Sequence, residues 1–403
     1  MKILVAVTTG RAMFSSVLDM IAENVRMHGH TTMHTVGVMI NYDTTFTGLS
    51  DAHFIYQNHD AIFSEVIYAS NGDLEKYKGI LRRHGLPEDA IRGILQPAGY
   101  GNKKNIILME AIARAYDLVI FWDDDEYPVA CMRSERDLHW MHTDILGAHL
   151  AADRHIDVAF GFRTGHVSPI PPNIGTYLSS QTARLLGQAL AVGNDVVTES
   201  SFVDPQASFV ALAETPPLQE IAASGGGKWI YGGNLSMRTK SILQGTIPPF
   251  YTPADSRGDD TILAMRMLDA AVFRVPSGIF HDCFHQYPSI SKGQYPAHFD
   301  TGAVDTGRSI QRFAAALRGW LAYAPLLIRL REGSTYRSVI ERMRSMLGIV
   351  DRRLYRELTA VGEHLEHQPL SHILSYYAKE VDRQYEQLMI ATDGWTQLMY
   401  QLG

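Results

Sequence analysis

Four acidic residues in a row, Asp123 to Glu126, directly follow an apolar segment at residues 118–122. Such a segment is typical of a buried β-strand, and open α/β sheets bind ligands where their parallel strands end. Carboxylate oxygens are the ligands that hard divalent ions such as Mg²⁺ and Mn²⁺ prefer. We therefore predict that Asp123 and Asp125 hold a divalent metal ion. The alternative, a solvated acidic turn or a helix cap, is less consistent with a position directly after a strand.

The elements that must position these acids follow an α/β pattern over the first 300 residues, where short apolar segments alternate with helical periods. Strands are predicted at residues 2–8, 35–40, 118–122 and 158–162, with two short strands on either side of Pro276. Helices are predicted at residues 15–28, 104–116, 234–244 and 259–268. We expect a mixed, mostly parallel sheet flanked by helices, with residues 1–130 and 131–300 as its two halves.

The C-terminal part has a different composition. Residues 301–360 contain eleven arginines, no lysine and five acidic residues, which gives this segment a local charge of +6 in a chain of net charge −7. Apolar residues recur there with a helical period. These changes predict a domain boundary near residue 300 and an α-helical module over residues 301–403.

Composition excludes several classes of protein. The chain has 403 residues with 46% apolar and 20% charged content, which is typical of a globular protein of one or two domains. Its apolar start, residues 3–7, is too short for a signal peptide, and Pro325 interrupts the most apolar helical segment before it reaches the roughly 20 residues of a membrane span. Two cysteines without metal-ligand spacing support neither disulfides nor a zinc site. We expect a cytoplasmic protein with no nucleic-acid partner.

Four motifs, in order and within about residues 1–285, resemble those of GT-A glycosyltransferases, especially the family 2-like inverting enzymes. They are the DxD strand at residues 119–125, the GGN element at 231–238, the (E/D)D segment at 257–261 and the strand-end histidine at 279–281. The resemblance implies a GT-A, Rossmann-like fold. It also implies an enzyme that moves a sugar from a UDP- or GDP-linked donor to an acceptor hydroxyl, with Mn²⁺ or Mg²⁺ offsetting charge on the departing nucleoside diphosphate. The acceptor is a sugar, a lipid-linked molecule or a small molecule.

In this family the second acid of the (E/D)D segment is the catalytic base, which corresponds to Asp260. A carboxylate there would take the proton of the acceptor hydroxyl during an inverting attack. Asp259 would bind acceptor hydroxyls or orient its neighbour. Both acids are also favourable caps for the helix that follows, and one helix N-terminus can serve both purposes.

The resemblance also implies that His281 completes the metal site with Asp123 and Asp125. Imidazole is a common ligand for such ions, and Asp282 would orient the ring from outside the site. A single histidine is often structural, so this role stays open, with His285 as the substitute ligand.

Contacts to the donor and the acceptor follow from the same resemblance. Polar residues after the first two strands and at the start of a helix would hold the nucleotide, because free backbone N–H groups there bind phosphate. The expected donor-binding residues are Thr8, Thr9, Arg11, Asp43, Asn102, Lys103, Asp123 and Asp124. The expected acceptor-binding residues are Trp229, Gly232, Gly233 and Asn234. Ordinary capping by Asn102 and core packing by Trp229 are the alternatives.

Other activities remain open at this stage. A retaining GT-A enzyme would share the DxD motif and the histidine. A sugar nucleotidyltransferase also uses paired acids, but it needs a phosphate-binding loop after the first strand that residues 8–11 resemble poorly. A binding protein with a degenerate site is disfavoured by the intact acids.

The helical module has two possible roles. Arginines beside the apolar residues 313–328 suit docking at an anionic membrane, which would place the protein at the inner face of the membrane near lipid-linked acceptors. Packing against the catalytic domain or a second subunit is favoured instead, because the neighbouring helices also need an apolar partner.

Overall fold

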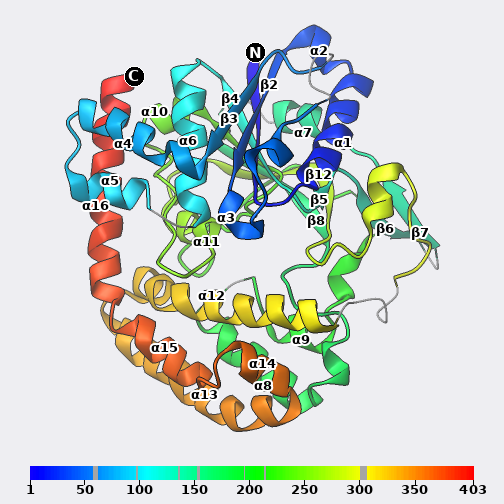
Figure 1. The fold of residues 1–403 in the computed structure, drawn as a ribbon, viewed down its shortest axis with the longest axis vertical. Coiled ribbons are helices and arrows are strands. Elements are labelled where there is room, and N and C mark those ends of the chain that lie inside the picture. Colours follow the sequence, from blue (N-terminus) through cyan, green and yellow to red (C-terminus); the bar gives the residue numbers. More distant parts are fainter. Residues whose placement is uncertain are drawn as a thin grey trace.

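A computed structural model describes residues 1–57, 62–96, 99–134, 137–151, 155–194, 196–212, 215–299 and 306–403. The expected domain boundary at residue 300 lies outside these residues. The described chain forms a nine-stranded sheet, a small three-stranded sheet and surrounding helices, with a group of C-terminal helices at one end (Figure 1). This arrangement confirms the expected mixed α/β fold with an α-helical C-terminal part.

The large sheet has the strand order β10-β12-β8-β11-β4-β1-β2-β3, and β5 pairs with β12. Strands β3, β2, β1 and β4 are parallel, as in a Rossmann-like half, while β11 runs antiparallel between β4 and β8. Its strands are β1 (Lys2–Thr9), β2 (Thr35–Tyr42), β3 (Val66–Ser70), β4 (Leu118–Asp123), β5 (Glu126–Tyr127), β8 (Val158–Gly165), β10 (Gln219–Glu220), β11 (Leu235–Arg238) and β12 (Val272–His281). The small sheet contains β6 (Ala130–Ser134), β7 (Asp137–Met141) and β9 (Ala211–Leu212).

Strand β1 lies at the centre of the sheet and is apolar on both faces. Ile3, Val5 and Val7 pack in the cluster that contains helix α1 (Phe14–Met27), while Leu4 and Ala6 pack on the opposite side with helix α6 (Tyr100–Ala113). Successive side chains of a strand point to opposite faces of the sheet. A strand that is buried on both faces therefore has a continuous apolar sequence. The register pairs Thr8 with Asp123, so β1 and β4 bring their polar ends to the same edge.

Helices cover both faces of the sheet (Figure 1). Besides α1 and α6, the first 300 residues form α2 (His30–Met33), α3 (Thr44–Thr47), α4 (Leu74–Arg83), α5 (Glu88–Ile94), α7 (Ile145–Ala151), α8 (Ser180–Ala191), α9 (Glu199–Val203), α10 (Thr239–Leu243) and α11 (Asp259–Ala264). The C-terminal helices are α12 (Thr306–Glu332), α13 (Tyr336–Glu357), α14 (Thr359–His364), α15 (Leu370–Ala378) and α16 (Val381–Leu402).

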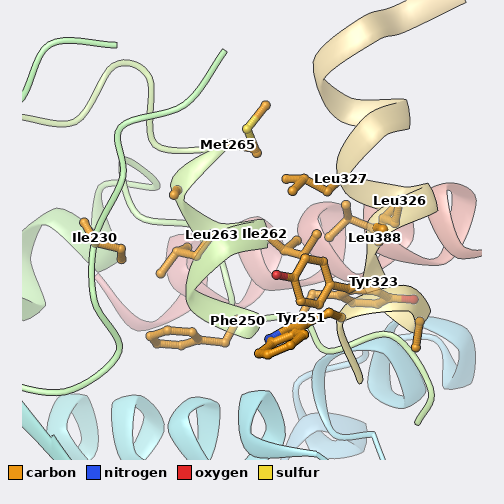
Figure 2. Packing of buried hydrophobic residues seen from close by; sticks show 14 of the residues in the cluster. Ile230, Phe250, Tyr251, Ile262, Leu263, Met265, Tyr323, Leu326, Leu327 and Leu388 are labelled. Carbon is orange, nitrogen blue, oxygen red and sulfur yellow. The ribbon is translucent and has the colours of Figure 1, made fainter. Parts of the chain in front are cut away.

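The C-terminal helices are built into the core of the protein. Helix α16 returns along α5, where a Cβ on Gly93 would lie 2.6 Å from Ala391 and a Cβ on Gly394 would lie 2.6 Å from Ala90. Such a close approach of two helices requires glycine at both positions. Figure 2 shows the same core from within: Ile262 of α11 lies on the side that faces α12 and Leu388 of α16, while Leu263 lies on the side of Ile230 and Phe250.

The apolar side chains of α12 are buried in this core, including Phe313, Leu317 and Leu321. By length and composition alone, the stretch Gly307–Glu357 is apolar enough to cross a membrane, but 78% of its apolar window is buried inside the protein. This is how the core helix of a globular protein behaves. The packing interpretation of residues 313–328 is therefore supported, and a membrane could reach these side chains only if they left the core.

Three expectations about local structure were wrong. Residues 235–238 form strand β11 and not the start of a helix, because they complete the sheet between β4 and β8. Strand β12 continues through Pro276 to His281, with a register irregularity against β8 between Arg274 and Gly278 that accommodates the missing N–H. Helix α12 also runs through Pro325, because burial on several sides outweighs the loss of one backbone hydrogen bond.

Candidate active site

A cavity of about 460 Å³ opens at the carboxyl ends of β1, β4 and β12 and extends to the start of α11 and one side of α12. It brings together both acidic motifs and the strand-end histidine. From the predicted site, its lining includes Thr8, Arg11, Asp123, Asp124, Asp125, Gly232, Asp259, Asp260 and His281. Sequence positions far apart therefore meet at one edge of the sheet, as in other open α/β proteins.

Arg11 is bound to the acidic turn after β4. Its Nη1 donates to Oδ1 of Asp124 at 2.7 Å and to Oδ2 of Asp125 at 2.9 Å. The hydroxyl of Thr9 donates to the other oxygen of Asp124 at 2.7 Å. Thr9, the last residue of β1, and Arg11, which follows the strand, thus hold the carboxylates of the turn in fixed orientations.

The two carboxyl groups held by Arg11 differ in acidity. Burial raises the pKa of Asp124 to about 6. Burial would also raise the pKa of Asp125, but the charge of Arg11 and the contact with His281 outweigh it and hold that pKa well below its usual range. Asp125 therefore stays ionised to lower pH than Asp124, which suits a metal ligand.

His281 faces Asp125 across the cavity floor. Its Nε2 lies 3.5 Å from Oδ1 of Asp125, and its Nδ1 is hydrogen-bonded to the backbone carbonyl of His166. A carbonyl only accepts, so Nδ1 carries a proton, and in the neutral form of the ring the lone pair of Nε2 points toward the carboxylate. Metal-ligating histidines commonly donate their second nitrogen to a carbonyl in this way.

The site fits a divalent ion only in part. Among the described residues, no group of three or more His, Cys, Asp or Glu side chains is arranged to hold a metal. The predicted set of Asp123, Asp125 and His281 is thus not a complete site by itself. Oδ1 of Asp125 and Nε2 of His281 are nevertheless close enough for one ion with bonds of about 2.0–2.2 Å to reach both. Mg²⁺-type ions typically take one or two protein ligands and complete their shell with substrate phosphates and water.

Asp259 and Asp260 begin helix α11, but they differ in their partners. Nζ of Lys104, from α6, lies 2.8 Å from Oδ2 of Asp259, and both side chains are buried. Oδ1 of Asp260 accepts from the backbone N–H of Thr261 at 2.9 Å. Lys104 neutralises Asp259, while burial and then the charge of Asp259 raise the pKa of Asp260. A carboxylate with a raised pKa is a better proton acceptor.

The glycine pair before β11 leaves room for charged side chains. A Cβ on Gly232 would lie 3.0 Å from Nζ of Lys104 and 3.2 Å from Oδ2 of Asp260. A Cβ on Gly233 would lie 1.8 Å from Oε2 of Glu126, which no side chain can tolerate. Glu126 is fully buried, and its other oxygen binds Arg163 at 2.8 Å. The pair therefore allows these charged groups to approach the backbone.

Several predicted donor contacts lie outside the cavity lining. Asp43 is paired with Nζ of Lys103 at 2.7 Å and caps α3 through the N–H of Thr45 at 3.0 Å. The side chain of Asn102 donates to the carbonyl of Gln96. Each of the three has a structural partner, and their contact with a nucleotide stays a prediction.

Two predicted acceptor contacts also have structural partners. Trp229 donates from Nε1 to the carbonyl of Ser224 at 2.8 Å and lies outside the cavity lining. Asn234 is buried behind β11, where its oxygen contacts Nε2 of His149 at 2.9 Å and its amide donates to the carbonyl of Ser277 at 3.1 Å. Asn234 has a positive φ of 47°, which asparagine tolerates better than most residues. Its observed role is to join β11, β12 and α7.

Four basic residues of the cavity were not expected from the sequence. They are Lys104 of α6, Arg163 of β8, Arg257 before α11 and Arg312 of α12. Nη2 of Arg312 lies 3.9 Å from Oδ2 of Asp125. Burial, and then the charge of Arg11, lower the pKa of Arg312. The excess of arginine in residues 301–360 was the one available signal, but it did not indicate which arginine reaches the site.

No family model matches the chain, and no curated protein matches it either. Among solved structures, it is similar to Staphylococcus aureus TarS 1–349 in complex with UDP-GlcNAc, at 11% identity and a TM-score of 0.38, over 100% of this chain and 91% of that chain. The mannosyltransferase PcManGT from Pyrobaculum calidifontis, in complex with GDP-Man and Mn²⁺, shares 12% identity at a TM-score of 0.35, over 96% and 85%. Mouse xyloside xylosyltransferase 1 shares 10% identity at a TM-score of 0.23, over 44% and 58%.

The solved structures similar to this chain thus include glycosyltransferases and complexes with nucleotide sugars, the class that its sequence motifs resemble. These TM-scores are low, and the geometry of the site therefore carries the functional assignment.

Proposed function

We propose that the chain is a metal-dependent glycosyltransferase that moves a sugar from a UDP- or GDP-linked donor to an acceptor hydroxyl with inversion at the anomeric carbon. The supporting observation is that one cavity contains two separate sets of carboxylates. Asp125 lies beside His281 and Arg11, where an anion or cation can be held. Asp260 lines the same cavity at the start of α11, where its Oδ1 accepts from the N–H of Thr261.

Arg11, Asp125 and His281 would hold the diphosphate end of the donor. Arg11 is a fixed guanidinium at the carboxyl edge of the sheet, a geometry suited to phosphate oxygens. A divalent ion bound by Asp125 and His281 would supply positive charge that offsets the charge developing on the leaving nucleoside diphosphate. Asp123, which lines the same cavity, is available to the ribose or the sugar.

Asp260 would act as the base. The acceptor oxygen forms its bond to the anomeric carbon while the bond from that carbon to the diphosphate oxygen breaks, and the hydroxyl proton moves to Asp260. Lys104 keeps the negative charge of Asp259 paired, which leaves Asp260 as the carboxylate that can receive a proton. Gly232 leaves space for both side chains at this point.

The cellular setting is part of the proposal. We infer a cytoplasmic enzyme, since nucleotide sugars and Mg²⁺ or Mn²⁺ would be its partners. Its acceptor is a sugar, a lipid-linked molecule or a small molecule. Contact with the inner face of the membrane, or a homodimer formed through residues 301–403, remains a proposal that exposed residues of α13 or α16 would have to mediate.

A thermal-shift screen with UDP, GDP, ADP and CDP, each with and without Mn²⁺, tests the donor assignment. We expect UDP or GDP to raise the melting temperature in the presence of Mn²⁺. The matching nucleotide sugars would then be incubated with a panel of acceptors, and NMR of the anomeric proton would report inversion or retention. Stabilisation by none of the nucleotides would contradict the function, while a retained anomeric configuration would contradict the inverting mechanism and the role of Asp260 as its base.

A further inference from the structure

We propose that Arg312 of α12, together with Arg257, binds the diphosphate of the donor, so that the C-terminal helices complete the donor site. The inference rests on the proposed function and adds residues from a part of the chain that the motifs of the sequence do not include.

One face of α12 forms a wall of the cavity. The lining residues of this helix are Arg312, Ala315, Ala316, Trp320 and Tyr323. The last four follow Arg312 by three, four, eight and eleven residues, a spacing that places all five along one side of a helix. The small side chains of Ala315 and Ala316 leave open space next to Arg312, and this space is continuous with the acidic turn of β4.

Arg312 and Arg11 both approach the same carboxylate oxygen. Nη1 of Arg11 lies 2.9 Å and Nη2 of Arg312 lies 3.9 Å from Oδ2 of Asp125. The shorter contact satisfies that oxygen, and the contact of Arg312 is too long for a hydrogen bond. Arg312 is therefore a largely buried cation, 26% exposed in its side chain, with hydrogen-bonding capacity that Asp125 does not use.

Arg257 adds a third guanidinium from the loop before α11. Its aliphatic stem lies against Gly319, where a Cβ would be 3.0 Å from Cγ of Arg257. Gly319 is two helical turns beyond Arg312 on the same face of α12. Among the described residues Arg257 makes no ion pair, and it lines the cavity together with Arg312.

Three guanidinium groups around one open space match a diphosphate better than a single carboxylate. Guanidinium binds phosphate oxygens through two parallel N–H donors, and a diphosphate offers oxygens on two phosphorus atoms. Donors arranged in advance around a leaving group stabilise the charge that develops as it departs. Arg312 would contribute to donor affinity and also to the chemical step.

The test uses full-length variants Arg312→Ala and Arg312→Lys, with Arg344→Ala as the matched control. Arg344 is an exposed arginine of α13 that pairs with Glu341. Affinities for UDP or GDP, whichever the wild type binds, and for the corresponding nucleoside would be measured by calorimetry at equal Mn²⁺. We expect Arg312→Ala to lose about 10-fold or more for the diphosphate, as when a hydrogen bond to a charged group is removed. The affinity of Arg312→Lys for the diphosphate should lie between those of Arg312→Ala and the wild type. Lysine keeps the positive charge but lacks the planar, forked arrangement of N–H donors of arginine.

The nucleoside separates a phosphate contact from general damage. We expect its affinity to change by less than about twofold in each variant, since that change is within typical surface effects. Unchanged diphosphate affinity in Arg312→Ala, or an equal loss for nucleoside and diphosphate, would overturn the inference while leaving the proposed function intact. Failure of the wild type to bind any nucleoside diphosphate would overturn both.

Discussion

His281 turns Nε2 toward Oδ1 of Asp125 at 3.5 Å, while its Nδ1 is hydrogen-bonded to the backbone carbonyl of His166. In the neutral ring this places a nitrogen lone pair opposite a carboxylate oxygen, so two electron-rich atoms face each other. A cation between them removes the repulsion. The arrangement favours a metal ion completed by the phosphates of the donor, and it makes the pair the most direct place to test metal dependence.

Removing either ligand should abolish metal-dependent binding. Wild-type protein with nucleoside diphosphate at about 100 times its dissociation constant should gain about 2.7 kcal/mol of stability in Mn²⁺, by mass action. We expect Asp125→Ala and His281→Ala to lose the Mn²⁺-dependent part of this gain in a thermal-shift assay, and EDTA to remove it from the wild type. His285→Ala is the control, because His285 lies outside the cavity lining. If the Mn²⁺-dependent stabilisation is lost in His285→Ala but kept in His281→Ala, the histidine ligand of the metal is His285 instead.

Replacing the base should separate transfer from binding. Asp260→Asn keeps the size of the side chain and its contact with the N–H of Thr261, but it removes the proton acceptor. We expect the rate of transfer to fall by about 10²- to 10⁴-fold with donor affinity retained. The control Asp269→Asn replaces an exposed acid that follows helix α11, and it should not change the rate of transfer. A rate of transfer near that of the wild type in Asp260→Asn would show that Asp260 serves only as a helix cap.

The pH dependence of transfer should respond in opposite directions to two neighbouring charges. Asp260 must be ionised to accept a proton, so kcat/KM should rise with pH through its raised pKa. Lys104→Met removes a positive charge and should move this acidic limb to higher pH. Asp259→Asn removes a negative charge and should move it to lower pH. Equal shifts of the same sign in the two variants would show that the acidic limb of the kcat/KM profile reports the ionisation of a group other than Asp260.

The contact between α11 and the C-terminal helices should determine stability. Ile262 of α11 is fully buried on the side that faces α12 and Leu388 of α16 (Figure 2), whereas Leu268 is 47% exposed. We expect Ile262→Ala to lower the free energy of unfolding by about 2–5 kcal/mol, and Leu268→Ala to change it by no more than about 0.5 kcal/mol. Urea denaturation followed by circular dichroism would measure both. Similarly small changes in both variants would mean that the C-terminal helices do not support helix α11, which carries Asp260.

The parallel part of the sheet and its acidic edge were predictable from the sequence alone. Strands β1, β2 and β4 are continuous apolar runs ended by polar residues, a local pattern that reports burial on both faces. Since parallel strands end at one edge, the position of Asp123 and Asp125 near Thr8 followed directly. The helical character of the C-terminal part was equally clear from its 3.6-residue period.

Strand β11 and the roles of Asn234 and Arg312 were decided only by tertiary structure. Residues 235–238 are strand because β4 and β8 offer hydrogen bonds on both sides, and no local pattern encodes that partner. Arg312 reaches Asp125 because α12 packs across the carboxyl edge of the sheet. A sequence period shows which face of a helix is buried, but the distance between two charged groups depends on how that helix packs. The amino-acid sequence therefore determined the elements and the acids, and the packing of α12 decided which cations face them.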